Sequence, residues 1–188
     1  IVPMRKRLDR ALDLIERLNE IDDGWKLIVK GKLPDQYPFM RAPNRASEMK
    51  YYESQMGRIS VSPILKNSVE FVDFSPTISD FYDRVDFVIS PSDFESFHYS
   101  VSEGAATGCY PVIWNWEGSE EFYPRNWIVD DTEKAADLIM EIHNNFTEEI
   151  PKKCRLVITQ SFSKEIVFDQ LNTTIFYSDE SRSLYRLS

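Results

Sequence analysis

The chain has 188 residues, 42% of them hydrophobic, which is enough for one ordinary domain with a core. Its net charge of -9 argues against duplex nucleic acid as a partner, and no apolar run approaches the ~20 residues of a transmembrane segment. The only cysteines, Cys109 and Cys154, are too few and too far apart for a disulfide framework, so we expect a reducing, cytoplasmic compartment.

Helical and strand patterns alternate along the chain. The predicted elements are a helix at 3–20, a strand at 25–29, a proline-rich loop at 33–44, a helix at 45–58, a strand at 69–72, a helix at 78–84, a strand at 86–89, a helix at 98–107, strands at 111–114 and 127–129, and helices at 131–144, 148–160 and 163–177. This order predicts an α/β fold, a doubly wound parallel sheet of the Rossmann-like type. We expect one nucleotide-sugar-binding domain over residues 1–178 and a disordered tail over 179–188, in a chain that begins inside a longer protein.

Two glutamates, Glu95 and Glu103, stand where a predicted strand gives way to a helix. Ligands bind doubly wound folds at the carboxyl ends of strands, and a helix start offers free amides to an anion, here near Phe97 and His98. Position alone therefore places Glu95 at a pocket rim and Glu103 within the helix, where its carboxylate could bind a vicinal diol. The same spacing also occurs by chance, and a histidine here is more often a cap or a surface residue than a ligand contact.

Four short motifs resemble the signature of retaining GT-B glycosyltransferases, above all family 4: Glu95-Ser96-Phe97, Glu103-Gly104-Ala105, Gly108 and Pro111-Val112-Ile113. Lys6-Arg7-Leu8-Asp9 is similar to a motif of Lys, Gly, a hydrophobic residue and Asp that begins the first helix of that family's C-terminal, donor-binding domain. The resemblance covers residues 3–145 and implies one half of a GT-B architecture.

The resemblance implies roles for the residues around the two glutamates in binding a nucleotide diphosphate sugar such as a UDP- or GDP-sugar. Glu103 would hold the ribose hydroxyls. Glu95 would be the catalytic residue, facing the donor sugar near the reacting centre. Ser96, Phe97 and His98 would also contact the donor, the last two through backbone amides on its diphosphate.

Other positions would complete the donor site. Lys6 would add positive charge to the diphosphate, and Arg5 would substitute for an arginine that the family's preceding strand usually supplies. Asp73 and Phe74, after the strand at 69–72, would contact the base. We expect no metal, because the family's chemistry works without one and the chain has no Asp-x-Asp word.

Three departures from the family pattern stand out. His98 and Arg7 each occupy a position where the family usually has glycine, and one residue is inserted within Cys109-Tyr110. A side chain at position 98 would either crowd the phosphate or add a donor to it.

The expected function is the donor half of a retaining hexosyltransferase of polysaccharide or glycoconjugate synthesis. Its saccharide or lipid-linked acceptor would bind an N-terminal domain outside these 188 residues, so we expect no transfer by this chain alone. The whole enzyme would be cytoplasmic, or peripheral to the inner face of the membrane. Two alternatives stay open: a non-catalytic nucleotide- or sugar-binding scaffold of the same fold, and a GT-B-shaped sugar-nucleotide epimerase.

Overall fold

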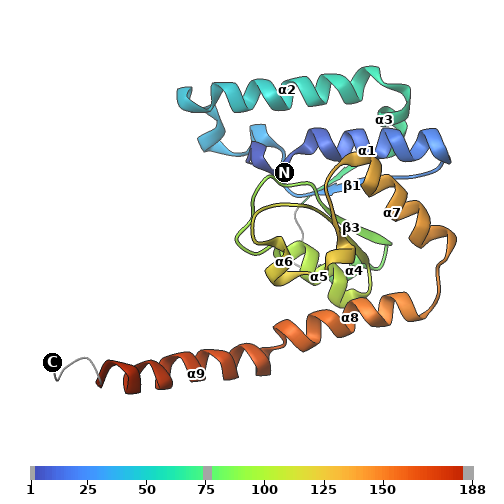
Figure 1. The fold of residues 1–188 in the computed structure, drawn as a ribbon. Coiled ribbons are helices and arrows are strands. Elements are labelled where there is room, and N and C mark those ends of the chain that lie inside the picture. The colour runs from blue at the N-terminus through green and yellow to red at the C-terminus, as the bar shows by residue number, and fades with distance from the viewer. Residues whose placement is uncertain (1–2, 74–77, 184–188) are drawn as a thin grey trace.

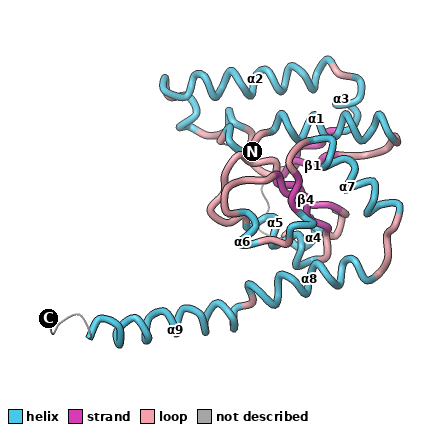
Figure 2. Tube along the Cα trace, in the orientation of Figure 1, coloured by secondary structure: helices cyan, strands magenta, loops and turns pink. Residues whose placement is uncertain are grey.

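The computed structural model describes residues 3–73 and 78–183, in which short parallel strands are surrounded by helices (Figures 1 and 2). The strands are β1 (Leu27–Lys30), β2 (Val69–Val72), β3 (Phe87–Ser90), β4 (Tyr110–Trp114) and β5 (Ile128–Val129). The α-helices are α1 (Leu8–Ile21), α2 (Ala46–Val61), α3 (Pro63–Ser68), α4 (Ser79–Tyr82), α5 (Tyr99–Thr107), α6 (Ser119–Phe122), α7 (Thr132–Asn144), α8 (Glu149–Phe162) and α9 (Lys164–Ser183). Short 3₁₀ helices are η1 (Met4–Lys6), η2 (Pro34–Gln36), η3 (Pro38–Arg41), η4 (Pro43–Arg45) and η5 (Arg125–Trp127).

All the described strand pairs are parallel, which confirms the predicted α/β class. The strands form two sheets, however, rather than the single sheet expected: β1 pairs with β2, and β4 lies between β3 and β5. β4 is buried at every position, as a central strand should be, whereas β1 and β3 are buried at only some of theirs.

Helix α1 connects two parts of the hydrophobic core. Leu8, Leu12 and Ile15 pack in a cluster with β1, α2 and α3, whereas Leu14 and Leu18 pack in a larger cluster around β4, α5 and α7. The two sets follow the helical period, so α1 presents apolar side chains over a wide arc, as a helix between two layers must.

The structure differs from the predicted elements mainly in short segments. Helix α3 was not predicted; it begins with Pro63 and is capped by Ser62, whose hydroxyl accepts a hydrogen bond from the Leu65 amide. The proline-rich loop at 33–44 contains the 3₁₀ turns η2, η3 and the start of η4, and each of these turns begins at a proline.

Helix α9 extends away from the rest of the domain (Figure 1). It ends at Ser183, so the predicted boundary between residues 178 and 179 falls within it, and residues 184–188 lie outside the described part. The proposed division of the chain therefore stays a prediction. None of the described helices combines the length and the apolar character needed to cross a bilayer.

Candidate functional site

The loop after β3 lies against the first residues of the chain. Ser90, the last residue of β3, and Ser92 are fully buried. The Asp93 amide donates to the Arg5 carbonyl at 2.9 Å, and the Arg10 guanidinium donates to the Pro91 carbonyl at 2.9 Å. These bonds bring the N-terminal segment to the carboxyl end of β3, the edge where parallel sheets bind ligands.

Glu95 pairs with the two cations predicted to bind phosphate. Its carboxylate is only 5% exposed, forms ion pairs with Lys6 and with Arg5 (3.1 Å), and accepts a hydrogen bond from the Ser92 hydroxyl at 2.7 Å. Burial alone would raise the pKa of Glu95, but the bonds from Lys6, Ser92 and Arg5 outweigh it and lower the pKa, which keeps the group charged. The expected rim position is therefore wrong, although the predicted grouping of Arg5, Lys6 and Glu95 is present.

His98 is the N-cap residue of α5, which begins one residue later than predicted. Its Nδ1 atom lies 2.5 Å from the Ser90 hydroxyl, so the imidazole is held on the end of β3. Burial and then the charge of Lys6 lower the pKa of His98 to about 4, and the ring is neutral at pH 7. The first intrahelical bonds run from Val101 and Ser102 to the His98 carbonyl, and the amides before them form the electropositive end of the helix.

Glu103 has different surroundings from Glu95. It is exposed on α5, and its carboxylate accepts a hydrogen bond of 3.4 Å from the Tyr82 hydroxyl, which also donates to the Ser100 carbonyl at 2.9 Å. Burial and then the charge of Glu103 raise the pKa of Tyr82, which therefore stays a hydrogen-bond donor. Glu103 thus keeps an accessible carboxylate that can accept further hydrogen bonds.

The predicted donor residues between the glutamates differ in exposure. Ser96 is exposed, whereas the Phe97 ring is partly buried in an aromatic cluster and lies 5.0 Å from the Phe162 ring of α8. The Phe97 side chain is therefore a packing group.

The predicted base-binding residues follow β2. Asp73 is exposed, and its carbonyl accepts a hydrogen bond of 3.3 Å from Lys30, whose ammonium also lies 5.2 Å from the centre of the Phe81 ring. Phe74 lies outside the described residues.

Arg7 explains one departure from the family pattern. Its backbone is left-handed, with φ of 52°, a conformation that glycine adopts without strain. The side chain forms ion pairs of 2.8 Å with both Asp9 and Asp93, and Arg10 also pairs with Asp93 at 3.0 Å. Sequence reasoning missed this ionic cluster because Asp93 is distant in sequence from both arginines.

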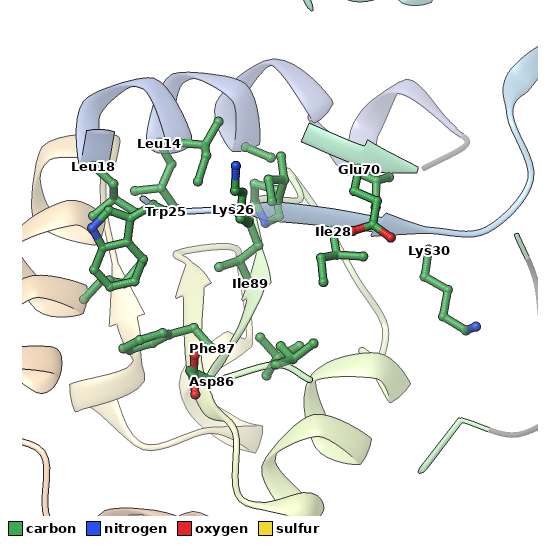
Figure 3. Close-up of a pocket in the computed structure, with 18 of the residues that line it drawn as sticks. Leu14, Leu18, Trp25, Lys26, Ile28, Lys30, Glu70, Asp86, Phe87 and Ile89 are labelled. Atoms are coloured by element: carbon green, nitrogen blue, oxygen red, sulfur yellow. The ribbon is translucent and has the colours of Figure 1, made fainter. Parts of the chain in front are cut away.

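A cavity of about 830 Å³ continues from this edge into the domain. Lys6, Ser92 and His98 line it beside the candidate site, and it runs between β1 and β3, where Trp25 and Phe87 also line it (Figure 3).

Within residues 3–73 and 78–183, we find no cluster of three or more histidine, cysteine, aspartate or glutamate side chains able to hold a metal ion.

Residues 1–145 match the sequence family described as glycosyl transferases group 1. The chain belongs to this family. No curated protein matches the chain significantly in sequence. The family match confirms the resemblance noted above.

Three solved structures show the same fold as this chain. A variant of TarM from S. aureus, in complex with fondaparinux, alpha-GlcNAc-glycerol and UDP, is 20% identical over 92% of this chain and 33% of its own, with a TM-score of 0.67. HepE from Anabaena, in complex with UDP, is 16% identical over 89% of this chain and 45% of its own, with a TM-score of 0.68. A sucrose-phosphate synthase from Thermosynechococcus elongatus is 18% identical over 94% of this chain and 44% of its own, also with a TM-score of 0.68.

This chain therefore spans from a third to somewhat under half of the length of these proteins. At such identities the likeness establishes the fold. It matches one half of a GT-B architecture, as the sequence predicts.

Proposed function

We propose that this domain binds a nucleotide diphosphate sugar and forms the donor half of a retaining glycosyltransferase. The observation that carries the proposal is the cluster at the carboxyl end of β3, where Arg5, Lys6 and the start of α5 converge beside Glu95. Family membership supports it, as does the UDP in two structures of the same fold. A helix start with two adjacent cations is a suitable environment for a diphosphate.

The diphosphate would compete with Glu95 for Arg5 and Lys6. Without a ligand, the carboxylate pairs with both cations and balances one of their two positive charges. As the bond between the sugar's anomeric carbon and the diphosphate of the donor breaks, negative charge grows on the leaving diphosphate, and the same cations with the α5 amides would stabilise it. Glu95, freed from one or both partners, would then lie near the donor sugar.

Glu103 would bind the ribose hydroxyls, because its carboxylate is exposed and already oriented by Tyr82. Asp73, exposed at the end of β2, would contact the base, which we propose to be that of a UDP- or GDP-sugar. Ser96 and the amides of Phe97 and His98 would complete the donor contacts. The neutral His98 ring, held by Ser90, would fill the space that the family usually leaves open with glycine.

The acceptor, a saccharide or a lipid-linked glycoconjugate, would bind the other half of the enzyme. We therefore expect this chain to bind the donor weakly and to transfer nothing alone. We place the enzyme in the cytoplasm or at the inner membrane surface, because both cysteines are free thiols.

Calorimetric titration with UDP, GDP, ADP and their hexose conjugates tests donor binding. The proposal predicts binding of at least one nucleoside diphosphate, with the corresponding sugar nucleotide competing for the same site. If the protein bound monosaccharides to saturation but bound no nucleotide, the proposal would be rejected.

The second candidate function is a non-catalytic binding module. The ion pairs of Glu95 favour it, because they satisfy the cations that a diphosphate would need. Transfer assays on the full-length protein separate the two: nucleotide binding with no turnover on any acceptor panel supports the module, and radiolabelled sugar transfer supports the enzyme.

A further inference from the structure

The segment that carries the two candidate phosphate-binding cations is held at its start by a helix outside the site. Arg5 and Lys6 lie in η1, which begins at Met4. The first amides of a helix have no partner within it, and the N-cap residue, Pro3, provides no side-chain hydrogen bond. The Met4 amide instead donates a hydrogen bond of 2.7 Å to the carboxylate of Glu48, in the first turn of α2. Glu48 therefore caps η1 across a long distance in sequence.

The Glu48 carboxylate is buried, with a relative exposure of 7%, so its charge needs compensation. Arg45 supplies it through an ion pair of 2.8 Å, and the N-terminal end of α2 adds a favourable dipole. The two oxygens are divided between two donors, because Oε1 accepts from Met4 and Oε2 from Arg45. A hydrogen bond to an ionised acceptor is stronger than a neutral one. The contact between α2 and η1 is therefore strong, and it holds the backbone rather than the cationic side chains.

Helix α2 also holds the other end of this segment. The Tyr51 hydroxyl accepts a hydrogen bond of 3.0 Å from the Asp9 amide and donates one of 2.7 Å to the Asp9 carboxylate. Asp9 lies in the first turn of α1 and pairs with Arg7, whose left-handed backbone connects η1 to α1. Tyr51 comes three positions after Glu48, on the same face of α2. The two side chains therefore hold the segment on both sides of the cations.

These contacts do not involve the groups for which a ligand would compete. Arg5 and Lys6 direct their side chains to Glu95, in the loop after β3. In the view of Figure 1, the first described residues lie between α2 and β3. A diphosphate that took the cations from Glu95 would remove these ion pairs, whereas the bond between Met4 and Glu48 would remain. The backbone position of the cations would then depend on α2.

We propose that Glu48 and Tyr51 are positioning residues for the diphosphate of the donor. They hold η1 so that its two cations stay at the carboxyl end of β3 after the ligand has displaced Glu95. A binding group has to be kept within about 0.5 Å of its productive position, and residues behind it provide that support. The inference rests on the proposed function, and it gives α2 a role in donor binding without contact with the donor.

Three variants of the full-length protein test the two positioning residues. Glu48→Leu removes the acceptor for the Met4 amide, and Glu48→Gln keeps an oxygen that can accept from it. Tyr51→Phe keeps the ring and removes only the hydroxyl that contacts Asp9, so it decides the question if Glu48→Leu does not fold. Calorimetry measures the affinity for the nucleoside diphosphate that the wild type binds and for the corresponding nucleoside.

The nucleoside separates positioning from a general loss of structure. Its proposed contacts, Glu103 and Asp73, lie outside η1. Glu48→Leu should weaken diphosphate binding on the order of tenfold and Tyr51→Phe about threefold, while nucleoside binding changes less than about twofold in both. Glu48→Gln should restore diphosphate binding to within about threefold of the wild type.

Arg58→Met is the matched control on the same helix. Arg58 joins α2 to α1 through ion pairs with Asp13 (2.6 Å) and Glu16, ~15 Å further along α2 than Glu48. This variant should lower the melting temperature and leave diphosphate binding unchanged.

The possible results separate the inference from the proposed function. Wild-type diphosphate affinity in every folded variant of Glu48 and Tyr51 would overturn the inference alone. An equal loss for nucleoside and diphosphate, or an equal loss in Arg58→Met, would overturn it too, because the effect would then be one of stability. If the wild type bound no nucleoside diphosphate, the proposed function would be rejected, and the inference with it.

Discussion

Arg7 provides a test of the backbone at the start of α1. Its φ of 52° lies in the left-handed region, which costs a residue with a Cβ about 1–2 kcal/mol. Arg7→Ala and Arg7→Gly both remove the ion pairs with Asp9 and Asp93, so their difference isolates the backbone term. The more flexible unfolded chain of the Gly variant lowers its stability by roughly 0.4–1 kcal/mol. The Gly variant should therefore be more stable than the Ala variant by about 0.5–1 kcal/mol.

Thermal unfolding followed by circular dichroism measures this difference. For a domain of this size we expect Arg7→Gly to melt roughly 2 °C above Arg7→Ala. The same pair at Arg17 is the matched control, because Arg17 lies within α1 and also forms ion pairs. There alanine should be more stable than glycine by about 1 kcal/mol. A Gly variant less stable than the Ala variant at position 7 would refute the left-handed conformation.

Four further substitutions test the packing and charge of the domain by thermal or urea unfolding. Glu95→Gln should cost about 2 kcal/mol at pH 7 by removing a charged, buried hydrogen-bond acceptor, and it should flatten the loss of stability below pH 4.5, where the lowered pKa makes the wild type acid-sensitive; equal stability at pH 7 would contradict the ion pairs. Because the pKa of His98 is lowered from 6.5 to about 4, the unfolded chain takes up the proton first, so stability is complete above pH 6.5 and falls towards pH 4; His98→Gln should remove that slope, and an unchanged slope would assign it elsewhere. Leu12→Ala, at a fully buried position, should cost about 3 kcal/mol, and a cost under about 1 kcal/mol would mean that the site is not packed as described. Gly108→Ala should cost roughly 1–3 kcal/mol, since φ is 103° and the new Cβ would lie 2.6 Å from the Arg155 guanidinium; a neutral result would show that the turn relaxes.

Periodic and well-capped elements could be predicted from the sequence. The strand at 69–72 has the predicted bounds, and the helix expected at 131–144 begins where the Asp131 carboxylate accepts from the Lys134 amide at 2.8 Å. Both depend on neighbouring residues alone. The six-residue helix α3 was missed because it is too short to show a period.

The interior of the candidate site could be predicted only in part. Motif resemblance brings Lys6 and Glu95 to one edge, but their ion pair joins residues 89 positions apart, and no local pattern reports it. The division into two sheets, with β1 and β3 unpaired with each other, could not be predicted for the same reason. Alternating apolar runs predict that strands exist, but which strands pair depends on contacts between distant parts of the chain. The burial of Glu95 follows from that long-range pairing.

Nucleotide binding by the full-length protein and its Glu103→Ala variant tests the central claim most directly. Glu141→Ala is the matched control, an exposed glutamate on α7. The account predicts that Glu103→Ala binds the nucleoside diphosphate at least about tenfold more weakly than the wild type, because a charged hydrogen bond is lost. The affinity of Glu141→Ala and the melting temperatures of both variants should stay unchanged. Equal affinity of Glu103→Ala and wild type would contradict the ribose role, and no binding of any nucleoside diphosphate by the wild type would contradict the donor site itself.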